Sequence, residues 1–197
     1  MAKKAAAKAA AKGAKKPMVT AGEAISLAEL RHIPAFASMG PADAALFLSA
    51  MEVHAAARGE PLFREGEVGE GLYVILEGRV SITKRNAKGG EREVAVLEPH
   101  EVFGEMDLIS DRPHNSGAKG HAACRLLFLP RRAFQEMLRK GNPGAASMVI
   151  YFARMLAGRL DANNKRMLEV LEGAARPGGH GSEFAEFKRR LLKEWTF

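Results

Sequence analysis

The sequence is poor in cysteine, tryptophan and tyrosine. Its 197 residues contain one cysteine, one tryptophan and two tyrosines. The single cysteine, Cys124, excludes a disulfide within the chain and any metal or iron–sulfur site that needs several cysteines. Such sparing use of cysteine is typical of proteins from reducing compartments, so we expect a cytoplasmic protein.

Long apolar runs are also missing. A membrane-spanning helix needs about 18 or more consecutive apolar residues, and the best candidate segment, residues 145–153, ends at Arg154. The N-terminal lysines are not followed by the apolar stretch that an export signal requires. The sequence therefore predicts no membrane contact and no export.

Acidic residues are absent from the first 16 positions, which contain six lysines. The whole chain has 30 Lys plus Arg and 23 Asp plus Glu, a net charge of +7, so the part after residue 16 is almost neutral. We interpret residues 1–24 as a disordered basic Ala/Lys arm. The arm either serves as a solvated tail or contacts nucleic acid without sequence specificity, through release of counterions.

The segment after the arm combines short helices with many short strands. Apolar residues recur at helical spacing between residues 25 and 51, and Pro34 and Gly40-Pro41 divide them into two short helices. Short apolar segments punctuated by glycines then follow at intervals of about ten residues, a spacing typical of a β-sandwich or barrel. The predicted strands are Val53–Ala57, Pro61–Arg64, Leu72–Leu76, Val80–Lys84, Glu93–Leu97, Val102–Phe103, His121–Cys124 and Arg125–Leu129.

After Pro130 the apolar period becomes helical, and a long helix is predicted from about Ala145 to Gly173. Its apolar residues repeat every seven positions, which favours pairing with a second helix, and a polar Asn163 in such a seam can fix a two-stranded register. Packing of the same stripe on the chain's own barrel is the alternative. The two seam positions hold Val149, Leu156, Asn163 and Val170, and Ala153, Leu160, Met167 and Ala174.

The final segment begins with a glycine-rich break at residues 178–181 and ends in an apolar pattern that predicts a short amphipathic helix. That helix could dock on the domain or on a partner. The predicted organisation is a basic arm (1–24), a barrel with N-terminal helices (25–142), a dimerisation helix (143–174), and a flexible break with a terminal helix (175–197).

Four motifs occur in fixed order between about residues 30 and 173. They are FREGE (63–67), LYVILEGRV (72–80), VFGEMDLI (102–109) and LLFLPRRAF (126–134), the last followed by the long helix. In this order and spacing the chain resembles a cyclic-nucleotide-binding domain of the catabolite activator and kinase regulatory subunit type. The resemblance implies a mainly β fold with flanking helices: an eight-stranded jelly-roll (double-stranded β-helix) barrel followed by a long C-terminal dimerisation helix.

The resemblance also implies a phosphate-binding cassette that opens at Phe103. Exposed N–H groups at the start of a helix favour an anion, and Gly104 would let the backbone approach the ligand closely. Glu105 would accept hydrogen bonds from the ribose 2′-hydroxyl, with Met106 beside it. Glu105 could instead be an acid stabilised by the helix dipole alone.

The later half of the cassette departs from the family pattern. A gap-free alignment places His114 where the family has its phosphate-binding arginine. A guanidinium is always charged and binds phosphate as a fork, whereas an imidazole is largely neutral at pH 7. Arg112, a protonated His114, and donors from Asn115 and Ser116 could restore binding. A retained site, a changed ligand and a silent pocket therefore all stay open.

The long helix carries a second feature that the resemblance connects with the ligand. In the catabolite activator this helix supplies two polar residues to the purine ring, and here Asn163 and Asn164 occupy the corresponding positions. An asparagine amide offers one donor and one acceptor, which suits adenine. Asn163 therefore has two interpretations, as a base contact and as a polar residue of the dimer seam.

Enzyme motifs are not found. The six histidines are scattered, and the sequence contains no zinc-binding histidine pair, nucleophile elbow, Walker loop or dinucleotide fingerprint. We expect no catalytic residue, metal or cofactor. The 24 residues after Gly173 are too few for a winged helix-turn-helix, so sequence-specific DNA binding is not expected.

The sequence thus predicts a non-enzymatic regulatory homodimer that binds cyclic AMP or cyclic GMP and signals through its helix to an unidentified downstream protein. The alternatives are a degenerate barrel that serves as a protein-interaction scaffold without nucleotide, and a dimer whose basic arm contacts nucleic acid.

Overall fold

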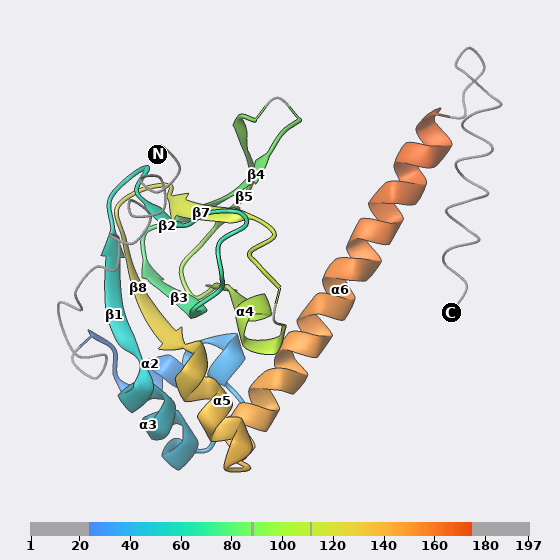
Figure 1. Cartoon of the computed structure of the whole chain (residues 1–197). Helices are drawn as coiled ribbons and strands as arrows, with labels where there is room; N and C mark the ends of the chain where they lie inside the picture. The colour runs from blue at the N-terminus through green and yellow to red at the C-terminus, as the bar shows by residue number, and fades with distance from the viewer. Residues whose placement is uncertain (1–23, 88, 111, 175–197) are drawn as a thin grey trace, which may run out of the picture. The chain divides into compact units, whose positions relative to one another are not determined.

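Two four-stranded antiparallel sheets form the body of the protein. The computed structural model describes residues 24–87, 89–110 and 112–174. The strand order is β1-β8-β3-β6 in one sheet and β2-β7-β4-β5 in the other (Figure 1). The strands are β1 (Glu52–Ala56), β2 (Pro61–Phe63), β3 (Gly71–Glu77), β4 (Val80–Arg85), β5 (Glu91–Leu97), β6 (Val102–Phe103), β7 (Gly117–Gly120) and β8 (Cys124–Pro130).

These two sheets confirm the mainly β jelly-roll prediction, although they form a sandwich and not a closed cylinder. Strand β8 lies inside the first sheet, between β1 and β3, and its sequence CRLLFLP is buried along most of its length. A nearly continuous apolar run is what a strand covered on both faces requires. Its register places Phe128 opposite Tyr73 of β3.

One strand prediction was wrong. The strand expected at His121–Cys124 lies instead at Gly117–Gly120, as β7. A side chain at Gly120 would begin 2.3 Å from the Ala57 carbonyl oxygen, and one at Gly117 would begin 2.7 Å from Thr83 Oγ1. Close packing against neighbouring segments therefore selects the glycines, which local strand propensity disfavours.

Short helices follow where the sequence supplies starting residues. The two predicted N-terminal helices are confirmed, with an additional 3₁₀ turn between them. Ser26 and Glu29 form a capping box at the first helix, and prolines begin the next two elements. The helices are α2 (Leu27–His32), η1 (Pro34–Phe36), α3 (Pro41–Ala50), α4 (Glu105–Ile109), α5 (Arg131–Arg139) and α6 (Pro143–Ala174).

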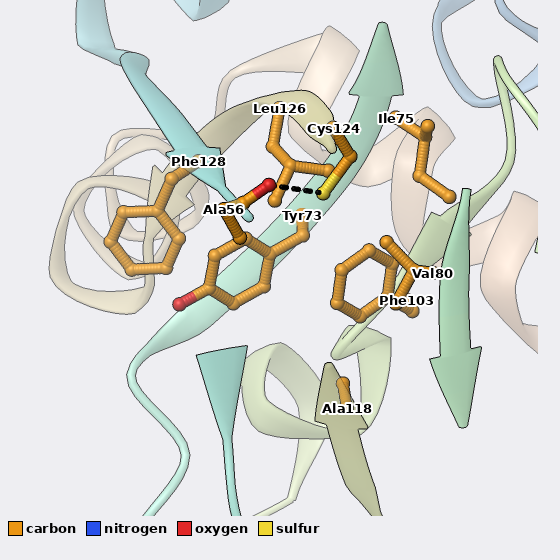
Figure 2. Close-up of a cluster of buried hydrophobic side chains, with 9 residues drawn as sticks. All are labelled: Ala56, Tyr73, Ile75, Val80, Phe103, Ala118, Cys124, Leu126 and Phe128. Atoms are coloured by element: carbon orange, nitrogen blue, oxygen red, sulfur yellow. Dashed lines mark hydrogen bonds between the residues drawn. The ribbon is translucent and has the colours of Figure 1, made fainter. Parts of the chain in front are cut away.

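Aromatic side chains fill the space between the sheets. Figure 2 shows Tyr73, Phe103 and Phe128 within the main buried cluster, where Cys124 Sγ lies 3.7 Å from the Ala56 carbonyl oxygen. The Tyr73 and Phe103 rings stack with their centroids 5.1 Å apart. The buried thiol acts as a small apolar side chain in this cluster.

The long helix is confirmed as α6, which spans Pro143–Ala174. The Asn142 side chain accepts a hydrogen bond from the Ala145 N–H at 2.9 Å and donates one to Asp43 Oδ1 at 2.7 Å. Asn142 therefore caps α6 and ties its start to α3.

The chain divides into two compact units between Ile150 and Tyr151, a point inside α6. Among residues 24–174 as described, no helix is long and apolar enough to cross a membrane. The predictions for the basic arm and for the terminal helix fall on residues 1–23 and 175–197, outside the described residues.

Candidate ligand-binding cassette

The cassette begins where β6 passes into α4. Gly104 lies between them with a positive φ of 79°, a conformation that residues other than glycine rarely adopt. A Cβ at this position would also lie 2.6 Å from the Gly71 carbonyl oxygen. Both the backbone conformation and the close approach of β3 therefore require glycine at position 104. This is the residue that we predicted to let the backbone approach the ligand.

The side chains around Gly104 are mostly buried. Phe103 faces the aromatic core, Glu105 is 5% exposed, and Met106 is about one third exposed at 36%. Ionisable side chains are rarely buried so deeply without a role or a partner. Because an ionised carboxylate only accepts hydrogen bonds, Glu105 is suited to a ligand that presents hydroxyl groups.

His114 lies inside the domain and not on its surface. Its Nδ1 is 3.2 Å from Asp107 Oδ1, and the two side chains are only 6% and 2% exposed. The imidazole also stacks on Phe63, with ring centroids 3.7 Å apart and ring planes 5° from parallel. The predicted anion-binding residue is therefore held on one edge by a carboxylate and on one face by an aromatic ring.

Burial controls the charge of this pair. It raises the pKa of Asp107 to about 7, with a further contribution from the nearby Glu105 carboxylate. Burial also lowers the pKa of His114, while Glu67 opposes that change. Both shifts follow from the cost of placing a charge in a low-dielectric environment.

Backbone hydrogen bonds hold His114 in place. Its N–H donates to the Glu67 carbonyl oxygen at 2.8 Å, and its carbonyl oxygen accepts from the Gly66 N–H at 2.8 Å. The next residue, Asn115, accepts a hydrogen bond from Lys84 Nζ through its carbonyl oxygen. The cassette is therefore connected to the β2–β3 loop and to β4.

The remaining predicted site residues are spread more widely. Arg112 is exposed, and its N–H donates to Ser110 Oγ at 3.3 Å. Ser116 is half-buried. Asn163 is exposed and Asn164 half-buried, and both belong to the unit that begins at Tyr151, so their contact with a purine ring stays a prediction.

Sequence reasoning missed two residues of this site, Asp107 and Phe63. Asp107 could have been found from its place among the apolar residues of VFGEMDLI. Burial of an acid is costly, so an acid in an apolar segment indicates a specific contact. Across the described part of the chain, no three His, Cys, Asp or Glu side chains lie close enough to hold a metal ion.

Comparison with known proteins identifies the same domain. A family model of the cyclic nucleotide-binding domain matches residues 53–140. The solved N-terminal domain of a transcriptional regulator from Streptomyces coelicolor is 32% identical, with a TM-score of 0.59, and the match covers 68% of this chain and 95% of that one.

Curated relatives are longer proteins, and the chain spans about half of their length or less in most cases. The cyclic AMP receptor protein of Thermus thermophilus is 30% identical over 127 residues, which are 64% of this chain and 59% of the relative. A cAMP-dependent protein kinase regulatory subunit of Blastocladiella emersonii is 30% identical over 109 residues, 55% of this chain and 27% of that protein. With its jelly-roll fold and cassette, the chain belongs to the cyclic nucleotide-binding domain family.

Proposed function

We propose that this protein is a non-enzymatic regulatory module that binds a cyclic nucleotide of the cyclic AMP or cyclic GMP type. The relatives whose names mention a ligand are cyclic AMP receptors and cyclic-AMP-dependent kinase regulatory subunits. The cassette of this chain is the segment in which the proposed ligand would lie, between Phe103 and Ser116.

The observation that carries the proposal is the Gly104–Glu105 corner. Gly104 packs closely against Gly71, and the buried Glu105 immediately starts α4. Because α4 has only five residues, its dipole contributes little, and individual N–H groups and side chains must hold the phosphate. Glu105 would then bind the ribose, while the end of the cassette at His114–Ser116 would face the phosphate.

The test is calorimetric titration of the purified chain with cyclic AMP and with cyclic GMP. We expect saturable binding, and we expect Glu105→Gln to weaken it at least tenfold. The amide keeps the volume of the side chain but loses the negative charge that strengthens hydrogen bonds donated by hydroxyl groups. A hydrogen bond to an ionised partner contributes about 1.5–3 kcal/mol.

Glu98→Gln serves as the matched control, since Glu98 is exposed and lies outside the cassette. Its affinity should equal that of the parent protein. Absence of binding and of any ligand-induced rise in melting temperature at millimolar nucleotide would refute the proposed function.

Signal transfer is proposed to run through α6 into a homodimer. The predicted seam includes Leu160, which is 56% exposed, and the exposed Asn163. Exposed leucine at heptad spacing favours a second copy as the partner, and a seam asparagine would fix the register. A ligand that orders the cassette would shift the population of helix arrangements toward one of two states.

Leu160→Glu should therefore convert a dimer into a monomer, because it places a charge within an apolar seam. Sedimentation equilibrium measures the change, and we expect the dissociation constant to rise at least 100-fold. Lys165→Glu is the control, since Lys165 is exposed and lies on the heptad position opposite the seam. A dimer that tolerates Leu160→Glu would argue against this interface.

One observation favours a second candidate function, a scaffold without nucleotide. His114 already contacts Asp107 through Nδ1 and stacks on Phe63, so this nitrogen is not available to a phosphate. The titration separates the two functions, since a scaffold gives no heat. Nucleic-acid contact by residues 1–24 stays a prediction from the sequence.

A further inference from the structure

Asp107 is an acid at the centre of the proposed ligand site. Its carboxylate oxygen Oδ1 lies 3.2 Å from His114 Nδ1, and both side chains are almost completely buried. Any ligand oxygen that bound this nitrogen would have to take the place of Asp107 Oδ1. In geometric terms, the carboxylate already occupies the position of an anionic ligand on His114.

The surroundings enclose the carboxylate tightly. A Cβ at Gly69 would lie 2.1 Å from both Cγ and Oδ1 of Asp107, so the β2–β3 loop can cover this side chain only with glycine. The other carboxylate oxygen, Oδ2, is buried and makes no hydrogen bond of good geometry to the described residues, although the Gly71 backbone N–H acts on the carboxylate and lowers its pKa. A buried acceptor without a well-aligned donor costs free energy, so this arrangement is not explained by a gain in stability.

The charges around the pair are mainly negative. Glu105 on α4 and Glu70 in the β2–β3 loop act on Asp107, and Arg131 at the start of α5 opposes them. Tyr73 of β3 is close enough for the Asp107 carboxylate to act on its hydroxyl group. On the other side, Glu67 acts on His114. A phosphate that entered here would meet acids on two segments, α4 and the β2–β3 loop, and the guanidinium of Arg131.

We propose that Asp107 limits the affinity of the cassette for anionic phosphate, as an internal competitor that occupies His114 Nδ1. The inference rests on the proposed function and deepens it. A cyclic phosphate binds only when the His114–Asp107 contact opens. Ligand affinity is therefore set by a carboxylate that the chain itself supplies.

The experiment compares four proteins by calorimetric titration with cyclic AMP and cyclic GMP at pH 7.5. They are the parent chain, Asp107→Asn, His114→Arg and the double variant. We expect Asp107→Asn to bind at least tenfold more tightly than the parent. We also expect His114→Arg to gain more in the Asp107→Asn background than alone, because Asp107 would otherwise pair with the new guanidinium.

The exposed Glu136→Gln on α5 is the control for removal of a negative charge, and it should leave the affinity unchanged. Melting temperatures establish that each variant is folded, and Asp107→Ala replaces Asp107→Asn if the latter is not. A folded Asp107 variant that binds no better than the parent overturns the competitor role alone. Lack of binding by all variants at millimolar nucleotide overturns this role and the proposed function together.

Discussion

Replacing Asp107 with asparagine should raise the free energy of unfolding at pH 8 by about 3 kcal/mol. The carboxylate is 2% exposed, and burial raises its pKa from 3.8 to about 7. A shift of about three pKa units corresponds to about 4 kcal/mol. From this gain in the free energy of unfolding we subtract about 1 kcal/mol, because a neutral amide makes a weaker hydrogen bond with His114 than a carboxylate does.

The pH dependence follows from proton binding. Between about pH 4 and pH 7 the folded protein keeps the Asp107 proton while the unfolded chain loses it. The stability of the parent protein therefore falls as the pH rises through this window and levels off above pH 7. The difference between Asp107→Asn and the parent should grow from pH 4 to pH 7 and then stay constant.

Urea unfolding curves recorded from pH 5 to pH 8 measure this difference. His114 is present in both proteins, and its lowered pKa therefore contributes to both curves. Asp161→Asn, at an exposed position of α6, is the control and should follow the parent. Equal stability of Asp107→Asn and the parent at pH 8 would show that the buried carboxylate carries no penalty.

Phe47→Ala should be the most destabilising of the substitutions considered, at about 3–5 kcal/mol. Phe47 is fully buried, and its ring lies edge-on to Phe36 at 6.0 Å and to Phe134 at 6.3 Å between centroids. The three rings join α3, η1 and α5. Truncation would leave a cavity where these helices meet, because fixed helices cannot close around it completely.

Leu46→Ala provides a close comparison, since Leu46 is the preceding residue of α3 and is 45% exposed. Its cost should stay near or below about 1 kcal/mol, because much of the side chain is already in water. Thermal unfolding measures both variants, and a drop of roughly 10 °C is expected for Phe47→Ala. If both variants lowered the melting temperature by similar amounts, Phe47 would not be a main contributor to the stability of the core.

Much of the fold could be predicted because local patterns and spacing encode it. The regular glycine spacing indicated the strands, and the heptad pattern indicated α6. The order and spacing of the four motifs indicated the jelly roll through the resemblance to a known family. Strand β7 was the exception, because the sequence GAKG has little strand propensity and pairs only where Ala57 and Thr83 leave no room for side chains.

The candidate site was also predictable only in part from the sequence. Its first half, Phe103–Glu105, could be located from the sequence, since a glycine before a short helix has a recognisable local role. For the second half, ligand binding by His114 stays a prediction, and no local pattern indicated that His114 would contact a second buried side chain. Its contact with Asp107 depends on how the β2–β3 loop holds residue 114 through backbone hydrogen bonds.

The sequence by itself determined the jelly-roll family and the long α6 helix, and it predicted the position of the cassette. Only the tertiary structure decided the state of that cassette. Asp107 and His114 meet because two backbone hydrogen bonds fix His114 against residues 66–67, while Phe63 of β2 stacks on its ring. Burial then disfavours the charged form of both groups, and burial is a property of the packed chain, which no local sequence pattern specifies.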